Sequence, residues 1–217
     1  MKHSRRRLRT TAVLLGAVLL ASCASIPLSR SYLGNTTYGT SVIAPGEWKS
    51  FDAVAVLAGS PDATQSYIEA FGPEGVDPTK PMFGGVPGGV LIVNLYPGLD
   101  AGRIAARNAL IIDLDAAVSA GAVTILAESG PVVDGLWERR SLLLEVRLEN
   151  GNRAVPPPPG TVMRVLQETM LATRSTGKDA AGIELFPLKT LILGCSTECF
   201  AANEKVLRDV LDSWRVE

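Results

Sequence analysis

The most regular part of the chain is LKTLILGCSTECFAANEKVLRDVLDSWRV, residues 188–216. Its first residues are mostly apolar and branched, which is typical of a buried strand, and we place this strand at Ile183–Leu193. From Glu198 to Arg215 the apolar side chains recur at helical spacing, with charged side chains on the opposite side. Ser196 or Thr197 can cap the first turn of this helix. The sequence therefore predicts a buried strand that leads directly into an amphipathic terminal helix.

The rest of the chain contains further strand and helix patterns. Apolar or alternating runs predict the strands Asp52–Ala58, Gly89–Tyr96, Ala122–Ala127 and Leu142–Leu148. Helical spacing predicts helices over Pro61–Phe71 and Asp100–Gly121. Thr161–Thr173 is open between helix and strand, and its pattern alone favours a helix. We therefore expect an α+β fold with a mostly antiparallel sheet flanked by helices, an α/β sandwich that the C-terminal amphipathic helix closes.

The ending of the chain resembles that of one known group of folds. A strand leads through a small turn into a helix that finishes Val210-Leu211-Asp212-Ser213-Trp214-Arg215-Val216. This arrangement is similar to the last element of the PsbP and DcrB type of fold. The resemblance implies a central antiparallel sheet between helices, in a family made up mostly of binding or assembly modules. It carries no catalytic motif over to this chain.

The N-terminus has the layout of a secretory signal peptide. Lys2, Arg5, Arg6, Arg7 and Arg9 precede an apolar run from Ala12 to Ala21. A ten-residue helix rises only about 15 Å, whereas the hydrocarbon core of a bilayer is roughly 30 Å thick. We therefore interpret residues 1–22 as an export signal, with the general secretory and twin-arginine routes both open.

The end of this signal, Leu20-Ala21-Ser22-Cys23, resembles the lipobox of bacterial lipoproteins. The resemblance implies cleavage before Cys23 and attachment of a diacylglycerol to its sulfur atom. Ala24 follows the cysteine in place of aspartate, which by the same resemblance favours the periplasmic face of the outer membrane over the inner membrane. We expect a lipid-anchored protein with three parts: the signal 1–22, a flexible tether 23–39 and a single α+β domain 40–217.

Removal of the signal changes the chemistry of the chain. The remaining 195 residues carry 16 basic and 22 acidic side chains, a net charge of −6, which disfavours nucleic-acid binding. The single histidine, His3, leaves with the signal, so Ser-His-Asp and Cys-His catalysis are excluded and the commonest zinc ligand is lost. We expect no catalytic residues, no metal and no cofactor.

Two cysteines remain besides Cys23. Cys195 and Cys199 form an even pair in an oxidising compartment, which indicates a disulfide bond at the corner between the last strand and the last helix. A redox-active pair is the alternative, although the Cys-x-x-x-Cys spacing differs from that of thioredoxin-like sites.

Two functions remain open at this point. The first is a non-enzymatic envelope lipoprotein that docks to, or helps assemble, an envelope protein partner. The second is a small-ligand-binding protein or an enzyme that uses carboxylates such as Asp113, Asp115 or Glu128. A pocket of about 300 Å³ or more with convergent carboxylates would favour the second function, and an exposed apolar patch over a filled core would favour the first.

Overall fold

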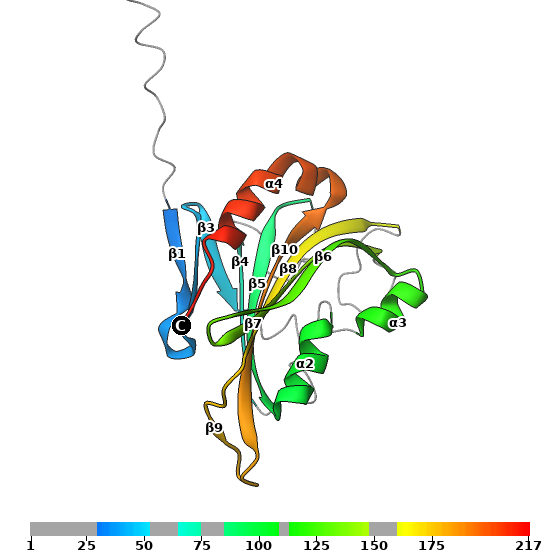
Figure 1. Cartoon of the computed structure of the whole chain (residues 1–217). Coiled ribbons are helices and arrows are strands. Elements are labelled where there is room, and N and C mark those ends of the chain that lie inside the picture. Colours follow the sequence, from blue (N-terminus) through cyan, green and yellow to red (C-terminus); the bar gives the residue numbers. More distant parts are fainter. Residues whose placement is uncertain (1–29, 53–64, 75–84, 109–112, 148–159) are drawn as a thin grey trace, which may run out of the picture.

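The computed structural model describes residues 30–52, 65–74, 85–108, 113–147 and 160–217 (Figure 1). Its strands are β1 (Arg30–Asn35), β2 (Thr40–Pro45), β3 (Trp48–Asp52), β4 (Gln65–Pro73), β5 (Gly88–Pro97), β6 (Val123–Asp134), β7 (Trp137–Arg147), β8 (Val162–Ala172), β9 (Gly177–Lys178), β10 (Glu184–Ser196) and β11 (Arg215–Val216). Its helices are α2 (Leu99–Arg107), α3 (Leu114–Ser119), α4 (Thr197–Asp212) and the short 3-10 turn η1 (Thr36–Tyr38). The described chain is therefore an α+β protein.

The main sheet has the strand order β3-β4-β5-β10-β8-β7-β6, and the two-residue strand β9 pairs with β10. All its strand pairs in the described residues are antiparallel. A second sheet has the order β1-β2-β11 and joins the two ends of the described chain. The last long strand of the sequence, β10, thus lies in the middle of the main sheet.

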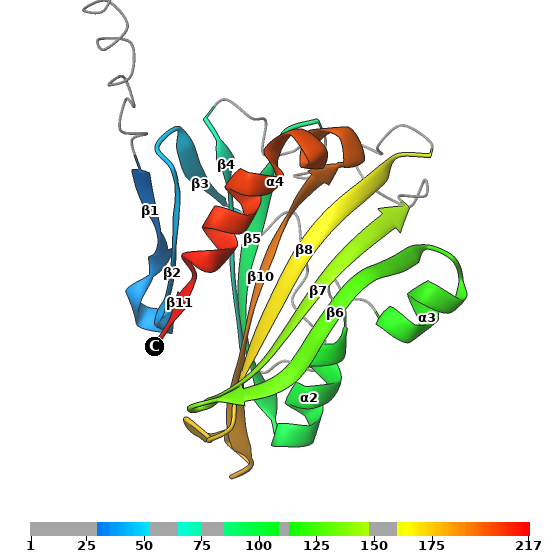
Figure 2. The same cartoon turned by 45° about the horizontal axis from the view of Figure 1, so that its top comes forward.

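Side chains of the central strands alternate between the two faces of the main sheet. On one face, Leu91, Leu191 and Leu193 pack with Phe200 and Leu207 of α4. On the other face, Val90, Ile92, Ile192 and Leu188 of the same strands are buried with the helices, which contribute Leu114 of α3 and Ala106 of α2. Helices therefore contact both faces of the sheet, and Figure 2 shows α4 across the upper part of one of them.

A close contact sets the position of α2. A Cβ atom added at Gly102 would lie 2.6 Å from a side-chain methyl carbon of Leu171 in β8. Only glycine lets the helix backbone approach the sheet this closely.

Several predictions from sequence are confirmed. The predicted strand Gly89–Tyr96 lies within β5, and the predicted strands on either side of residues 128–141 are extended into the β6–β7 hairpin. The final strand and helix are β10 and α4, and Ser196 caps α4 by accepting a hydrogen bond from the backbone N–H of Cys199.

The prediction of a helix over Thr161–Thr173 is wrong, because Val162–Ala172 forms β8 between β7 and β10. Both faces of this strand are covered: Val165 packs on the side of α3 and Leu166 on the side of α4. A strand buried on both faces does not alternate between apolar and polar residues, so its apolar positions mimicked a helical stripe.

Two other helix predictions also fail. Residues 65–71 of the helix expected over Pro61–Phe71 lie in β4, where Ile68 and Phe71 face opposite sides of the sheet. The single helix expected over Asp100–Gly121 is replaced by two short ones, because Asn108 has an extended backbone that ends α2.

Residues 30–38 of the expected tether 23–39 form a strand and a 3-10 turn, and residues 23–29 lie outside the described residues. Arg30–Asn35 forms β1, which pairs along its whole length with β2, and Gly39 ends η1 in the left-handed conformation. The alternating exposure of β1 shows one face on the protein and one in solvent, a pattern that its polar composition concealed.

Some expectations fall outside the described residues. They include the export signal, Cys23 and all of the predicted strand Asp52–Ala58 except Asp52. In the described ranges, none of the helices has the length and apolar composition needed to cross a bilayer.

Candidate functional site

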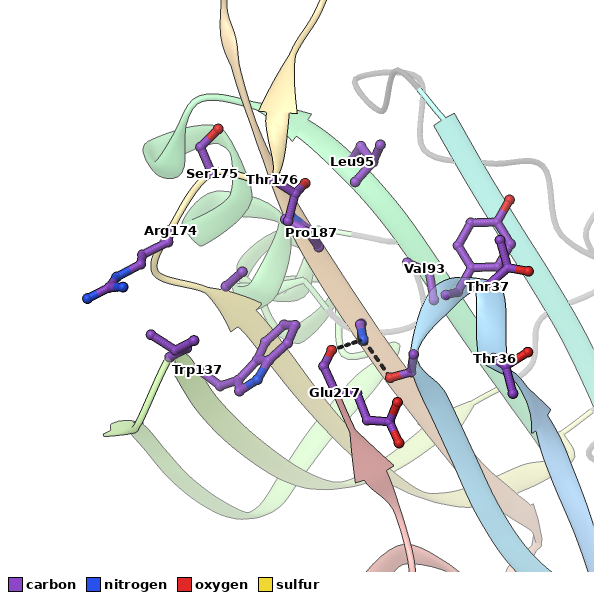
Figure 3. Close-up of a pocket in the computed structure, with 15 residues that line it drawn as sticks. Thr36, Thr37, Val93, Leu95, Trp137, Arg174, Ser175, Thr176, Pro187 and Glu217 are labelled. Carbon is purple, nitrogen blue, oxygen red and sulfur yellow. Dashed lines mark hydrogen bonds between the residues drawn. The ribbon is translucent and has the colours of Figure 1, made fainter.

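A trough of about 690 Å³ lies on the α4 side of the main sheet, beyond the part that α4 covers (Figure 3). Its floor comes from β5, β8 and β10, one side from η1, and the opposite side from the β6–β7 turn and the start of β7. The residues that line it are Thr36, Thr37, Tyr38, Gly39, Val93, Leu95, Leu136, Trp137, Ala172, Arg174, Ser175, Thr176, Pro187, Lys189 and Glu217.

Strand alternation explains why these side chains meet. Val93 and Leu95 share a face with Leu91, and Lys189 shares a face with Leu191. Of these residues, α4 packs against Leu91 and Leu191, whereas Val93, Leu95 and Lys189 line the trough. Tyr38 of η1 stacks on Tyr67 of β4, with ring centroids 4.5 Å apart, and this contact holds η1 beside the sheet. The floor of the trough is therefore the uncovered continuation of the core face.

Lys189 is the one charged side chain in the floor of this trough, and it is only 3% exposed. Its Nζ donates hydrogen bonds to the backbone carbonyl oxygens of Gly39 and Glu217, at 2.7 and 3.0 Å. The same atom lies 4.9 Å from the centroid of the Trp137 ring, within the range of a cation–π contact. Lys189 thus joins the main sheet to the small sheet and to one wall of the trough.

Burial lowers the pKa of Lys189 to about 8, and the nearby charge of Glu217 acts in the opposite direction. Removal from water penalises the ammonium form, and two carbonyl oxygens and one aromatic face replace only part of its hydration. An anionic group placed beside Nζ would supply a negative counter-charge that stabilises the ammonium form of Lys189.

The lowered pKa of Lys189 predicts a pH-dependent stability. Between about pH 8 and pH 10.5 the unfolded chain binds a proton at this lysine that the folded protein does not bind, so the free energy of unfolding rises with pH in that window. Below pH 8 both states are protonated, and this rise ends. We expect Lys189→Met to flatten the rise, as measured by urea unfolding across the window.

The exposed Lys49 provides the matched control for this experiment. Lys49→Met should leave the pH dependence as in the unmodified protein. Equal slopes for Lys189→Met and the unmodified protein would contradict the assignment of the lowered pKa to Lys189.

A second buried charge lies on the same face of the sheet. The carboxylate of Glu168, whose residue is 1% exposed, contacts the Arg139 guanidinium through two N···O distances of 2.8 Å, and Ser141 Oγ donates to it at 3.1 Å. Hydrogen bonding to Glu168 raises the pKa of Arg139 above its ordinary value. Arg139 and Ser141 also line a polar cavity of about 500 Å³ at the irregular part of β6.

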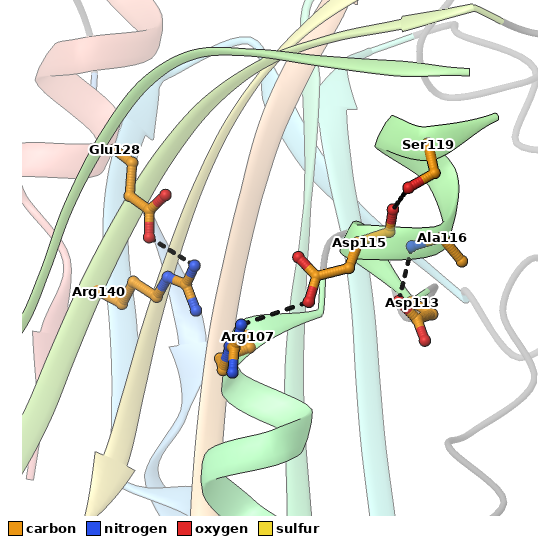
Figure 4. Close-up of polar contacts among 7 residues, drawn as sticks. All are labelled: Arg107, Asp113, Asp115, Ala116, Ser119, Glu128 and Arg140. Atoms are coloured by element: carbon orange, nitrogen blue, oxygen red, sulfur yellow. Dashed lines mark hydrogen bonds and ion pairs between the residues drawn. The ribbon is translucent and has the colours of Figure 1, made fainter. Parts of the chain in front are cut away.

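The carboxylates considered from sequence do not converge (Figure 4). Asp113 caps α3 by accepting a hydrogen bond from Ala116 N at 2.9 Å, and Asp115 lies 3.3 Å from Arg107 Nη2. Glu128 pairs with Arg140 across the β6–β7 hairpin. Each carboxylate is held by a different partner, and none of them lines either of the two cavities.

Cys195 and Cys199, the predicted pair, do lie together. The sulfur atoms of Cys195 and Cys199 lie 2.12 Å apart, at the distance of a disulfide bond, where β10 turns into α4. Both residues are buried in the core beneath α4, and the trough does not include them. Their position is that of a structural pair.

The sequence predictions missed Lys189, Trp137 as a trough residue, and Glu168. One signal was present, since a lysine between Leu188 and Leu191 in an apolar strand must either lie on a solvated face or be buried with partners. Whether Lys189 is solvated or buried depends on its contacts with Gly39 after η1 and with Glu217, and a local sequence pattern does not reveal contacts with such distant residues.

Comparison with known proteins finds structural similarity only. No known protein-family model matches the chain, and no curated protein sequence matches it. Among solved structures it is similar to cyanobacterial PsbP (CyanoP) from Synechocystis sp. PCC 6803, with a TM-score of 0.43 and 13% identity over 92% of this chain and 99% of that one.

Two other solved structures show similarity at the same level. The Ran-binding protein Mog1p from Saccharomyces cerevisiae gives a TM-score of 0.35 and 13% identity, over 87% of this chain and 96% of that one. A protein from Bacteroides thetaiotaomicron gives 0.37 and 10%, over 88% of this chain and 49% of that one. The chain therefore has a weak PsbP-like resemblance in fold, and no argument about function rests on it.

Proposed function

We propose that this protein is a lipid-anchored, non-enzymatic binding module of the bacterial envelope, and that the trough around Lys189 is its ligand site. The trough carries the proposal, because its volume of about 690 Å³ lies within the range of small-molecule sites and its lining is mostly apolar. The lipobox-like sequence that ends at Cys23 supports the anchored location. We also infer that the whole domain is an α/β sandwich closed by α4.

The chemistry of the trough indicates the class of ligand. Val93, Leu95 and Pro187 offer an apolar floor for a chain or ring, and burial of such a group is favourable in proportion to its area. Lys189 lies in that floor as a hydrogen-bond donor, and burial disfavours its charged ammonium form. An elongated apolar molecule with a carboxylate or another anionic head group satisfies both features.

Binding without catalysis fits the arrangement of the polar groups. Asp113, Asp115 and Glu128 are each held by another partner, and Glu168 is paired with Arg139. The part of the chain described by the structure thus supplies the trough with no carboxylate side chain except that of Glu217.

A matched series of probes tests the ligand class. We expect decanoate to bind more tightly than decanol or decylamine, as measured by calorimetric titration of the purified mature protein. Lys189→Met should weaken decanoate binding about tenfold or more, because a hydrogen bond to a charged group is worth about 1.5–3 kcal/mol. Lys178→Met, at an exposed lysine outside the trough, should not. Equal affinity for decanoate and decylamine would contradict the proposal.

The anchor needs its own test. We expect the unmodified protein to incorporate palmitate and to sediment with membranes, and Cys23→Ala to accumulate as an unprocessed, lipid-free precursor. A Cys23→Ala protein that is processed and remains membrane-bound as before would overturn the lipoprotein assignment.

Docking to an envelope protein is the second candidate function. The edge strand β6 is exposed along almost its whole length and ends in an apolar turn, where Val132, Val133 and Leu136 are 60%, 65% and 51% exposed. Exposed strand edges and apolar patches are common sites of protein contact. A photo-crosslinking residue at Val133 in intact cells should capture a partner if this surface is used, and one at the exposed Ala201 on α4 serves as the control.

A further inference from the structure

The outer face of the small sheet combines exposed apolar and basic side chains. Tyr32 of β1 is 70% exposed and pairs directly with Ile43 of β2, which is 39% exposed, so the two side chains lie next to each other on one face. Arg30 lies two residues before Tyr32 and therefore points to the same side. The register also brings Arg215 of β11 to this face, opposite Ser41.

The opposite face of the same sheet packs against the core of the protein. Val42 and Ala44 of β2 are buried in the core beneath α4, and Leu33 of β1 packs against them. The backbone of Ile43 is fixed as well, because its N–H donates to Ser213 Oγ at 2.8 Å. The Tyr32–Ile43 pair is therefore held on a rigid support and is directed away from the protein.

The sequence places this face close to the proposed anchor. Six residues lie between Cys23 and Arg30, and the seven residue-to-residue steps of this segment span at most about 25 Å when fully extended. Such a short connection keeps the small sheet at a high effective concentration near the lipid surface, so even a weak contact is populated. No other exposed apolar pair in the described residues begins so near Cys23 in the chain.

We propose that the outer face of β1 and β2 is a membrane-contact surface that rests on the phospholipid layer in which Cys23 is anchored. Tyrosine favours the headgroup level of a bilayer, with its ring toward the acyl chains, and arginine next to it can pair with lipid phosphate. Along the chain from Cys23, Arg30 comes first and Tyr32 second. This inference rests on the proposed lipid anchor.

The contact would set the orientation of the ligand site. β1 runs from Arg30 toward η1, and η1 forms one side of the trough at the far end of the strand (Figures 1 and 3). With the outer face of β1 and β2 on the membrane, β1 lies along the lipid surface, and η1 and the trough lie at the end of the strand that is farther from Cys23.

Spin labels on the mature lipidated protein test the proposal. We would attach a nitroxide at Tyr32→Cys or at Ile43→Cys and, as the control, at Val133→Cys in the β6–β7 hairpin, in vesicles of phosphatidylethanolamine and phosphatidylglycerol. All three positions are exposed, so the fold tolerates the label, and the bridged Cys195 and Cys199 do not react. Collision rates with oxygen and with an aqueous nickel chelate report the depth of each label.

We expect the chelate collision rate at positions 32 and 43 to fall several-fold on reconstitution, with oxygen collisions retained, and the rate at position 133 to stay unchanged. A label at 32 that remains as accessible to the chelate as the one at 133, on protein that floats with the vesicles, would overturn this inference and leave the anchor intact. Protection from both reagents would also overturn it, because this outcome indicates contact with a second copy of the chain. Protein that does not float would overturn both proposals.

Discussion

Replacement of Arg139 by methionine should lower the free energy of unfolding by about 3–5 kcal/mol, because it leaves a buried carboxylate without its partner. Glu168 is 1% exposed, and its two oxygen atoms face Arg139 and Ser141. The hydroxyl of Ser141 can donate one hydrogen bond but carries no charge. Urea unfolding of the variant, followed by circular dichroism, measures the loss.

A double variant separates charge from packing in this prediction. Arg139→Met combined with Glu168→Leu removes both charges and should recover most of the lost stability, since well-packed apolar residues often replace a buried ion pair without loss. Arg147→Met, at the exposed end of β7, should change the stability little. An additive loss in the double variant would contradict the role of Glu168 as a buried charge that depends on Arg139.

Replacement of Trp214 by alanine should lower the free energy of unfolding by about 3–5 kcal/mol and should also weaken decanoate binding. Trp214 is buried in the core beneath α4, and its Nε1 donates to Thr40 Oγ1 of β2 at 2.9 Å. The residue thus joins the end of α4 to the small sheet, which positions η1 at the side of the trough. Urea unfolding and calorimetric titration measure the two effects.

Trp214→Phe is the matched control, because it keeps an aromatic ring in the core and removes only the hydrogen bond and part of the volume. We expect it to cost about 1 kcal/mol for the hydrogen bond plus a small packing loss, with decanoate affinity retained. A variant Trp214→Ala that unfolds at a lower urea concentration but binds decanoate as before would show that the trough does not depend on the small sheet.

The elements that were predictable from sequence are those with a one-sided environment or a clear turn signal. The helix Thr197–Asp212 has one apolar side, so its spacing identified it, and the turn signal Asp134-Gly135 lies where β6 ends and the chain turns into β7. The helix predictions at β8 and β4 were wrong for a shared reason. Their apolar residues serve both faces of the sheet, and a three- or four-residue spacing then arises without a helix.

The candidate site was less predictable than the fold. The trough exists because α4 covers only part of one sheet face and because η1 lies beside the remainder, and η1 and α4 are more than 150 residues apart in the chain. Asp113, Asp115 and Glu128 were chosen as acids by type, and each is held by a partner that local spacing does not specify. The role of Lys189 could not be predicted from the strand that contains it, because its burial depends on contacts with Gly39 and Glu217 elsewhere in the chain.

The small sheet has a consequence for the order in which the protein can be completed. β2 pairs with β11, and the backbone of Ile43 is bonded to Ser213, 170 residues later in the sequence. Chains are synthesised from the N-terminus, so about 170 residues must be made after β2 before its partner β11 is available. Formation of this sheet closes the longest loop in the described structure, and a loop of that length carries a large entropic cost that late contacts must repay. The small sheet therefore lacks its third strand until Arg215–Val216 are available to pair with β2.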